Sequence, residues 1–428
     1  MKLLVIGRGG REHSLIWKIH QSPDVSKIYS ATGNAGISDL AECVPIRAEN
    51  IHELANFAEK KGIDLTVVGG PEISFMEGIV DEFVSRGLPI LGPTKEAAKI
   101  EGSKTFAKKM MRENGIPTSA FESFSDRDEA FAYIERVGHP LAIKADGMTG
   151  GKGFIIAKDA ATAKVAVHVI LKDRQFGQAG SRVIIEELLR GIDVSVLAFT
   201  DGDTIAPVAT ALYYKNAYDG DQGPITGGMG AVSPAPVIDQ AMEKRIMDEV
   251  LVPSLAAMKN EGLNYKGILQ IETIITKDGP KVVEFHVRFG DPETQVMLPR
   301  LESDIVKLFK AMMNGTLKEE QVKLSQRKAV AVVLVSGGYP MRYSINEEVG
   351  GLGALKETDN RIILHAGTCQ KSGKLVTMAG RVVNVVGLSD TFAGAAEEAY
   401  AVIDEITYNG KHYRKDIARK EIDREQVA

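Results

Sequence analysis

The sequence predicts an α/β protein whose N-terminal domain is built on a parallel sheet, and three observations lead to this. Short apolar strands alternate with helical patterns along the first part of the chain, an alternation typical of parallel sheets. Glycine-rich turns follow those strands, at the edge where open α/β sheets bind ligands. The length of 428 residues leaves room for two to four domains of roughly 150 residues each.

Four strands are expected in the N-terminal region, at residues 2–6, 27–31, 65–68 and 89–92. The turn after the first strand carries Gly7, Gly9 and Gly10, but Glu12 stands where the dinucleotide fingerprint has its third glycine. A nicotinamide-dependent dehydrogenase is therefore disfavoured. The turn can still offer backbone N–H groups to an anion, with charge added by Arg11 and His13. The alternative is a tight strand–helix turn without a ligand.

The middle and last regions mix strands and helices. A helix is expected at 105–114, and the apolar runs that follow predict strands. These lie at 141–145, 154–157, 183–189, 194–200, 204–212, 267–276 and 281–285. The stretch 218–230 is rich in glycine and aspartate and is expected to be a loop, while one helix is expected over 295–314. A polar linker at 314–329 leads to a third region, which opens with a strand at 329–336 and ends in a helix near 391–406.

Composition excludes several classes of protein. A net charge of −5 disfavours general binding to nucleic acid or to anionic membranes. The two cysteines, Cys43 and Cys369, are too few for a disulfide framework or a Cys-type zinc site, so a reducing, cytoplasmic location fits best. No apolar run approaches the ~18 residues of a membrane span. The apolar N-terminus leads directly into a glycine turn, so it is interpreted as a buried strand rather than a leader.

Two lysines near glycine-rich segments indicate a phosphate site. Lys144 lies on an apolar strand, and Lys152 follows within Gly150-Gly151-Lys152-Gly153. A glycine-rich hairpin with a lysine suits a polyphosphate, because backbone amides can approach closely and the ammonium adds charge. The Walker A spacing is absent. The alternative is a flexible hairpin with solvated lysines.

Two carboxylates suggest a metal site. Glu272 and Glu284 lie on two strands expected to form a hairpin, which would place them side by side. Such a pair repels unless a cation lies between its members, and oxygen ligands combined with nucleotide phosphates suit Mg²⁺. A pair of solvated strand carboxylates is the alternative. Arg288 and Asp291 follow closely and make the region densely charged, and a separate glycine loop at 227–230 could cradle an oxyanion.

Taken together, these segments resemble the ATP-grasp superfamily, and within it the phosphoribosylamine–glycine ligase (glycinamide ribonucleotide synthetase) family. The matching segments occur in order along nearly the whole chain. They are Gly9-Gly10-Arg11-Glu12-His13, Gly33-Asn34-Ala35-Gly36, Gly70-Pro71-Glu72, Glu101-Gly102-Ser103-Lys104, Lys144-Ala145-Asp146-Gly147, Gly151-Lys152-Gly153, Gly227-Gly228-Met229-Gly230, Arg288-Phe289-Gly290-Asp291-Pro292-Glu293-Thr294-Gln295, Gly380-Arg381-Val382 and Tyr413-Arg414-Lys415-Asp416.

The resemblance implies three domains: a pre-ATP-grasp domain at 1–102, an ATP-grasp domain at 103–326 with a mobile lid subdomain at 118–190, and a mixed α/β C-terminal domain at 327–428. It implies an ADP-forming C–N ligase of purine synthesis that joins glycine to 5-phosphoribosylamine through an acyl phosphate. ATP and Mg²⁺ (or Mn²⁺) are the implied cofactors and small molecules the partners, with a monomer or a dimer open. The alternative is a diverged paralogue that ligates another amino acid or amine.

Residue roles follow from the same resemblance. Arg288 and Lys144 are the implied catalytic residues. The implied ATP-binding residues are Lys104, Lys144, Gly151, Lys152, Gly153, Glu186, Glu187, Leu189 and Asp193. Glu272, Glu284 and His286 form the metal set. The implied substrate-binding residues are Gly10, Arg11, Glu12, His13, Gly33, Asn34, Gly36, Pro71, Glu72, Tyr213, Ile225, Thr226, Gly227, Gly228, Met229 and Asp291.

Several positions depart from the family pattern. His286 stands where the family has a metal-binding asparagine, and Glu272 adds an acid that this family lacks. Ile225 replaces an amide near the expected amino-acid site. Tyr213, Ile225 and Gln270 are therefore expected to line the acceptor pocket, and glycine is expected to be used less well than is usual for the family.

Overall fold

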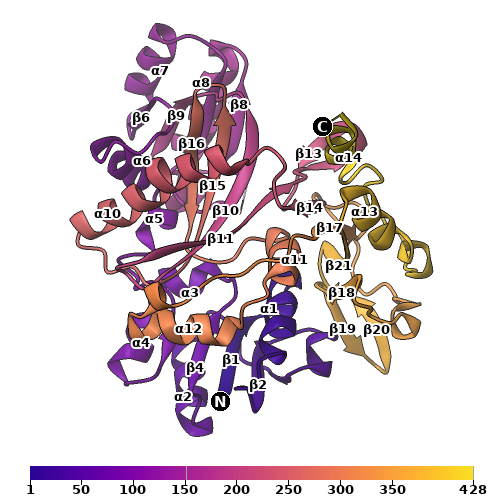
Figure 1. The fold of residues 1–428 in the computed structure, drawn as a ribbon. Coiled ribbons are helices and arrows are strands. Elements are labelled where there is room, and N and C mark those ends of the chain that lie inside the picture. Colours follow the sequence, from indigo (N-terminus) through magenta and orange to yellow (C-terminus); the bar gives the residue numbers. More distant parts are fainter. Residues whose placement is uncertain (151, 428) are drawn as a thin grey trace.

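The N-terminal part of the computed structural model, which describes residues 1–150 and 152–427, is a five-stranded parallel sheet. Its strands run in the order β3-β2-β1-β4-β5, and Figure 1 shows it at the bottom of the molecule. Their bounds are β1 (Lys2–Gly7), β2 (Lys27–Thr32), β3 (Glu42–Val44), β4 (Leu65–Val68) and β5 (Ile90–Leu91). The sequence predicted all of these strands except β3, which is short and only partly buried.

Helices of the N-terminal part connect these strands. They are α1 (Gly10–His20), α2 (Ile51–Lys61), α3 (Glu72–Met76), α4 (Ile79–Ser85) and α5 (Lys99–Gly102). Helix α1 begins immediately after the glycine turn that follows β1. The carboxyl end of β1 and the N-terminus of α1 therefore meet at the ligand-binding edge of the sheet.

An eight-stranded antiparallel sheet extends from the middle of the chain into its C-terminal part. The order is β16 (Gly279–His286), β15 (Gly267–Thr276), β10 (Ile192–Thr200), β11 (Ile205–Tyr213), β14 (Gly230–Ser233), β17 (Lys328–Val335), β21 (Arg381–Ser389) and β18 (Arg361–His365). The β14–β17 pair joins the two parts, with Gly230 opposite Val332 and Ser233 opposite Ala329. The middle and C-terminal regions thus share one continuous sheet.

The prediction of a loop over 218–230 is wrong for part of that stretch. Strand β13 (Gln222–Ile225) pairs with β12 (Asn216–Tyr218) in a short hairpin. All four residues of β13 are exposed, so no apolar alternation marks it as a strand in the sequence.

A third sheet forms the top of the molecule in Figure 1. It has the order β6 (Phe121–Phe124), β9 (Val183–Glu187), β7 (Leu141–Ala145) and β8 (Phe154–Ala157), and it is antiparallel. Helices α7 (Arg127–Arg136) and α8 (Ala160–Leu171) contribute to its own hydrophobic cluster, which includes Ile134, Ile143 and Val167. These elements fall within 118–190, the stretch expected to be a lid.

The helix expected over 295–314 is interrupted. Helix α11 (Glu293–Met297) runs into a 3-10 turn that contains Pro299, and α12 (Ile305–Asn314) begins only after Asp304, whose carboxylate accepts from the backbone N–H of Val306. Proline and a new N-cap explain the break. The remaining elements are α6 (Lys104–Glu113), α9 (Gln240–Arg245), α10 (Val252–Asn260), β19 (Thr368–Lys371), β20 (Lys374–Thr377), α13 (Phe392–Tyr400) and α14 (Arg419–Val427).

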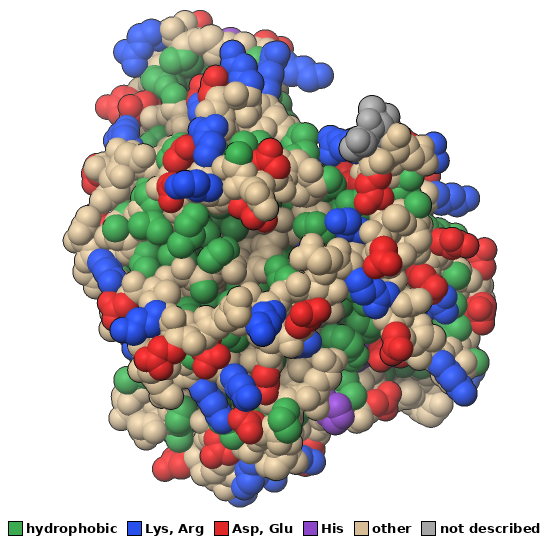
Figure 2. Space-filling model, viewed as in Figure 1, with side chains coloured by type: hydrophobic (Ala, Val, Ile, Leu, Met, Phe, Trp, Pro, Cys, Tyr) green, Lys and Arg blue, Asp and Glu red, His purple; other side chains and the backbone are tan. Residues whose placement is uncertain are grey.

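Acidic and basic side chains are interspersed over the face of the molecule drawn in Figure 2. This mixing agrees with the small net charge of the chain. Within the described ranges, none of the helices is long and apolar enough to cross a bilayer.

Candidate active site

The charged centre of the molecule lies where β15 and β16 face β7. Glu272 is directly opposite Glu284 in the β15–β16 register, so the expected placement of these two carboxylates on neighbouring strands is confirmed. The Lys144 ammonium, from β7, lies 3.2 Å from Glu284 and 3.4 Å from Glu186. Lys104, the first residue of α6, lies 4.0 Å from the other oxygen of Glu284. The structure therefore brings together five residues that the sequence singled out separately.

At this centre, ion pairing shifts the pKa values of the charged groups more than burial does. Burial alone would lower the pKa of Lys144, but Glu186 and Glu284 hold it above its ordinary value. Burial opposes the charged form of Glu284 too, yet Lys104 and Lys144 keep its pKa well below the usual range. The ammonium and the carboxylate are thus both charged at neutral pH.

Glu186 uses its side chain inside the protein. Its carboxylate contacts the Lys108 ammonium at 2.9 Å and accepts a hydrogen bond from the Ser119 hydroxyl at 2.6 Å. Its other oxygen, Oε1, is buried 3.4 Å from the Lys144 ammonium and has no hydrogen-bond partner among the described residues. The sequence analysis did not single out Lys108, which is buried beside Glu186 and supplies one of its two cations.

His286 bridges two carboxylates. Its Nδ1 lies 3.0 Å from Glu101 and its Nε2 lies 3.1 Å from Glu272. Burial alone would lower the pKa of His286, but Glu101 and Glu272 raise it to about 10. In this arrangement the His286 ring is held between the two carboxylates, one at each ring nitrogen.

The donor set fits a magnesium ion that is held partly by phosphates. In the part of the chain that the structure describes, no three His, Cys, Asp or Glu side chains converge as a ready-made metal site. Glu272 and Glu284 supply carboxylate oxygens from neighbouring strands, and Mg²⁺ commonly takes one or two carboxylates together with phosphate oxygens and water. The two glutamates fit that pattern.

One N–H group of the Arg288 guanidinium has no hydrogen-bond partner among the described residues. Its Nη2 lies 3.3 Å from Glu101, whereas its Nε is 3.8 Å from Glu72. That Nε is buried and has no hydrogen-bond partner among the described residues. A buried donor without a partner is costly, so an anionic group placed there would be bound favourably.

Several residues expected around ATP lie on or next to strands of the third sheet. Lys152 is exposed and Gly153 is buried, whereas Gly151 lies outside the described residues. Glu187 accepts from the backbone N–H of Ala120 at 3.0 Å, and Leu189 is half-buried just beyond β9.

Lys215 was not singled out by the sequence analysis. Its ammonium lies 3.1 Å from Asp193. Burial opposes its charge, but Glu272 and Asp193 raise its pKa. It therefore brings a further cation to the pair formed by Glu272 and Glu284.

At the N-terminal turn, Glu12 acts within the protein. It is buried and accepts from the backbone N–H of Gly9 at 2.5 Å and from Arg11 Nε at 2.7 Å. The Arg11 guanidinium passes so close to Gly70 that a Cβ there would lie 1.5 Å from its Cζ. Arg11 also donates to the carbonyl of Phe289 at 3.0 Å. Gly70 is therefore required for Arg11 to cross between the N-terminal and middle regions.

His13 does not supply the expected charge. Its Nδ1 accepts from the backbone N–H of His365 at 2.8 Å. Burial, followed by repulsion from His365, lowers the pKa of His13 to about 3, and burial lowers that of His365 to about 4. Both imidazoles are neutral at physiological pH, so the expectation of positive charge at His13 is wrong.

The 33–36 turn is organised by Asn34. Its amide donates to the carbonyls of Arg8 and His365, and its oxygen accepts from the N–H groups of Gly36 and Ile37. Because every polar atom of Asn34 is engaged, its direct role is to hold the turn against the C-terminal part. Gly33 adopts a φ of +76°, which favours glycine.

The loop after β13 is held from both sides. Thr226 donates to the carbonyl of Lys215 and accepts from the N–H of Gly228. The Gly227 N–H donates to the Tyr339 hydroxyl at 3.0 Å, and its carbonyl accepts from Arg381 at 2.7 Å. The C-terminal part therefore fixes this loop.

Arg381 also lies 3.1 Å from Asp291, and the pKa of that buried carboxyl is lowered by Arg381 and Arg11 in spite of burial. Met229 is fully buried against Val333 and Val335, so its side chain is part of the core. Arg381 and Tyr339 were missed as site residues, because their partners are 90 or more residues away in sequence.

The three residues expected to line the acceptor pocket lie in different surroundings. The Tyr213 hydroxyl donates to Glu272 at 3.3 Å. Ile225 is 48% exposed on β13 and so buries little apolar surface. Gln270 is buried. Its Oε1 accepts from the N–H of Gly290, and its Nε2 donates to the carboxylate of Glu293. Gln270 therefore supports the backbone beside Arg288 and has no amide atom left for a ligand.

The remaining predicted substrate residues lie at the same edge of the N-terminal sheet. Gly10 is buried, and a Cβ there would meet the Asn384 amide at 2.3 Å. Pro71 and Glu72 begin α3, where Glu72 faces Arg288.

Family models match most of the chain. They are the phosphoribosylglycinamide synthetase N domain over residues 1–101, its ATP-grasp domain over 102–294 and its C domain over 329–420. A phosphoribosylamine–glycine ligase of Caldanaerobacter subterraneus subsp. tengcongensis is 47% identical, and the alignment covers 98% of this chain and 99% of the relative. One of Pseudomonas aeruginosa is 44% identical over 100% and 99%.

Solved structures give the same picture. The phosphoribosylamine–glycine ligase of Thermotoga maritima superimposes with a TM-score of 0.84 at 29% identity, covering 97% of this chain and all of the other. A biotin carboxylase of Campylobacter jejuni shares the fold at 15% identity, with a TM-score of 0.75 and coverage of 96% and 92%. Family models and full-length relatives agree, and the chain belongs to the phosphoribosylglycinamide synthetase family of ATP-grasp ligases.

Proposed function

We propose that this chain joins glycine to 5-phosphoribosylamine and converts ATP to ADP and phosphate. The observation that carries the proposal is the full-length similarity, at 43–47% identity, to relatives named phosphoribosylamine–glycine ligase. The alternative of a diverged paralogue with another acid is not favoured by these matches. The exposure of Ile225 also removes the reason to expect weaker use of glycine.

The proposed reaction has two steps. A glycine carboxylate oxygen attacks the γ-phosphorus of ATP, the bond to the β,γ-bridging oxygen breaks, and glycyl phosphate and ADP form. The amine nitrogen of phosphoribosylamine then attacks the carbonyl carbon, loses a proton and expels inorganic phosphate. The protein must position three ligands, offset phosphate charge and exclude water, which would hydrolyse the acyl phosphate.

The chain's own cations support the first step. Lys144 and Lys104 flank Glu284 and would donate to the phosphates of ATP. The free Nε of Arg288 would bind the transferred phosphoryl group or the substrate carboxylate. Because Glu186 keeps Lys144 charged and fixed, the ammonium needs little reorganisation during the reaction.

Glu272 and Glu284 are the proposed metal ligands, for Mg²⁺ or Mn²⁺, with His286 beside them as a fixed cation. A bound divalent ion would offset phosphate charge and orient the γ-phosphate. ATP and magnesium dependence is general for the ATP-grasp family. We assign the adenine side to the backbone of 186–189 and the ribose to Asp193.

The phosphoribosyl end is assigned to the edge of the N-terminal sheet. The backbone N–H of Gly10 begins α1, where an anion is stabilised, and Arg11 adds charge, whereas the N–H of Gly9 already donates to Glu12. We retain 1–102, 103–326 and 327–428 as the proposed domains, with 118–190 as the proposed lid. Its separate hydrophobic cluster supports that division.

The test is a coupled ADP-release assay with purified chain, ATP, Mg²⁺, phosphoribosylamine and one amino acid at a time. ADP release should require both glycine and phosphoribosylamine, and alanine and serine should be poor substitutes. The variant Glu284→Gln should lose on the order of 10²-fold or more in kcat, because it removes one of the two carboxylates that Lys144 contacts and also a proposed metal ligand.

The matched control is Glu348→Gln, which removes an exposed carboxylate paired only with Lys374 and should leave the rate unchanged. Equal turnover with alanine and glycine would contradict the substrate assignment. An unchanged rate in Glu284→Gln would contradict the site.

A further inference from the structure

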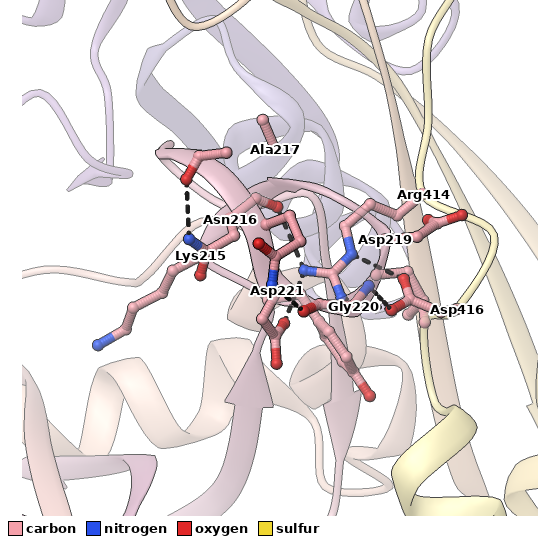
Figure 3. Close-up of polar contacts among 12 residues, drawn as sticks. Lys215, Asn216, Ala217, Asp219, Gly220, Asp221, Arg414 and Asp416 are labelled. Atoms are coloured by element: carbon pink, nitrogen blue, oxygen red, sulfur yellow. Dashed lines mark hydrogen bonds and ion pairs between the residues drawn. The ribbon is translucent and has the colours of Figure 1, made fainter.

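The β12–β13 hairpin is held by a distant part of the chain. Its four outer residues, Gln222–Ile225, are all exposed and give the hairpin no core of its own. The segment 412–416 runs alongside it, and Figure 3 shows Arg414 enclosed by acidic groups from both segments. We call Arg414, Asp416, Asp219 and Asp221 the Arg414 clasp.

Arg414 is the most enclosed member of the clasp. Its side chain is 0% exposed. Nε and Nη2 donate to the two oxygens of Asp416 at 2.8 and 2.7 Å, in a fork that only a planar guanidinium can make. Nη1 donates to Asp221 at 2.9 Å and to the carbonyl of Asn216 at 3.2 Å. The ring of Tyr214 lies 5.0 Å from the guanidinium carbon.

Backbone hydrogen bonds complete the clasp. The N–H of Gly220 donates to Asp416, and the N–H of Lys415 donates to Asp219, both at 2.8 Å. His412 Nε2 lies 2.9 Å from the carbonyl of Ala217. The whole hairpin turn is therefore tied to the C-terminal segment rather than to the strands before and after it.

The two ends of the hairpin lead into the active site. Lys215 precedes β12 and points away from Arg414 in Figure 3, toward Asp193 and the glutamates of β15 and β16. Thr226 follows β13, bonds the carbonyl of Lys215, and leads to Gly227 and Gly228. A shift of the hairpin would move both ends together, because Thr226 and Lys215 are bonded to each other.

We propose that Arg414 is a positioning residue for the ligase reaction: its clasp fixes the hairpin so that Lys215 and the 226–228 loop stay in place for the amino acid. This rests on the proposed function and on the expectation, from the family resemblance, that Thr226, Gly227 and Gly228 bind substrate. Arg414 itself is too deeply enclosed to touch a substrate.

The experiment compares Arg414→Lys with Arg361→Lys. Arg361 makes a partly buried ion pair with Glu398 in the same C-terminal part, away from the hairpin, so it reports a general loss of stability. Arg414→Lys should raise the KM for glycine by about tenfold, within the roughly 10²-fold cost of misplacing a reacting group. The KM for ATP should stay within about twofold, and Arg361→Lys should change neither constant.

A second variant approaches the clasp from the hairpin. Asp221 is partly exposed and also pairs with Lys420, so Asp221→Asn should fold even if Arg414 variants do not. It should raise the KM for glycine in the same direction. Hydrogen exchange should quicken at residues 216–225 in both clasp variants and not at β16.

Three results would overturn the proposal. One is an equal loss of kcat in Arg414→Lys and Arg361→Lys without a change in the KM for glycine. Another is a tenfold rise in the KM for ATP alone. The third is unchanged exchange at 216–225. If the wild-type chain shows no glycine-dependent activity, the proposed function fails, and the exchange measurement still decides whether the clasp holds the hairpin.

Discussion

At the scale of single residues, the site is a set of buried charges that compensate one another. Lys108 and Lys144 contact Glu186, Lys144 also contacts Glu284, and His286 contacts Glu272. Well-packed apolar residues often stabilise a fold as well as such buried pairs do. The charges are therefore best understood through the reaction, because they are held in place before a polyphosphate arrives and need not reorganise.

The buried histidine pair makes a prediction about acid stability. The folded chain keeps the pKa of His13 at about 3 and that of His365 at about 4, whereas an unfolded histidine titrates near 6.5. As the pH falls below 6.5, the unfolded chain takes up protons that the folded chain does not. The stability that these groups contribute is full above pH 6.5 and is lost as the pH falls toward 4 and then 3.

The variant His365→Gln should therefore unfold with a shallower pH dependence. Each proton that unfolding no longer takes up lowers the slope of the unfolding free energy against pH by about 1.4 kcal/mol per pH unit. Urea unfolding at pH 7.5, 6.5, 5.5 and 4.5 measures it, and most carboxylates titrate below that window. The exposed His20 provides the control variant His20→Gln, which should keep the wild-type slope. A wild-type slope in His365→Gln would show that the imidazole is not kept neutral.

The sequence predicted contacts between residues whose segments lie close to each other along the chain. The facing of Glu272 and Glu284 follows from a hairpin with a short turn, and that placement was predicted. Arg381 and Lys108 were not predicted, because their partners come from distant parts of the chain and no local pattern marks them. The neutral state of His13 likewise depends on burial by the C-terminal part.

At the scale of elements, the start of the loop after β7 is hydrogen-bonded to two other segments, one around Ala179 and the other at the start of α6. The Gly147 N–H donates to the carbonyl of Ala179 at 3.0 Å, and a Cβ on Gly147 would lie 2.7 Å from the Ala179 backbone. Asp146, just before it, accepts from the N–H of Thr105 and thereby reaches the start of α6, where Lys104 lies. A displacement of the loop should therefore shift Lys104 and the part of the site that is proposed to bind the ATP phosphates.

The variant Gly147→Ala should raise the KM for ATP by about tenfold while the KM for glycine changes less than twofold. The reason is that the added methyl group meets backbone, which cannot rotate away. Steady-state kinetics with each substrate varied measures the two constants. Gly138→Ala, in the same small sheet region with nothing near its Cβ, is the matched control and should behave as wild type. If Gly147→Ala and Gly138→Ala have the same KM for ATP, this loop is not part of the ATP site.

Elements with an apolar pattern were predicted well, and elements held by polar contacts were not. Buried strands such as β4 and β7 match their predicted bounds, because burial on both faces leaves a continuous apolar run. The exposed β13 and the break before α12 escaped prediction. A pairing that depends on a distant clasp, and a cap placed within an otherwise helical pattern, leave little periodic signal.

At the scale of the whole molecule, the C-terminal part contributes strands and side chains to the region around the proposed active site. One sheet runs from β16 to β18 through the β14–β17 pair, and Arg381, Tyr339 and His365 reach from it to loops of the other parts. A disturbance at the β14–β17 seam should therefore affect both halves of the sheet.

Gly230 is the position that tests this continuity. A Cβ on Gly230 would lie 2.6 Å from the carbonyl oxygen of Ala331 across the seam and 2.7 Å from Ile417. The variant Gly230→Ala should lower the free energy of unfolding by about 1–3 kcal/mol through overpacking. Because the strands are hydrogen-bonded in one ladder, hydrogen exchange should quicken in β11 on one side and in β21 on the other.

Gly353→Ala supplies the comparison, since nothing lies within 4 Å of its Cβ in the same C-terminal part, and it should leave exchange in both strands unchanged. Faster exchange confined to β17 and β21 would mean that the seam separates two independently stable halves. Faster exchange on both sides would mean that β11, whose Tyr213 contacts Glu272, draws part of its stability from the C-terminal part. Loss of that part would then weaken the site even where no substrate contact is removed.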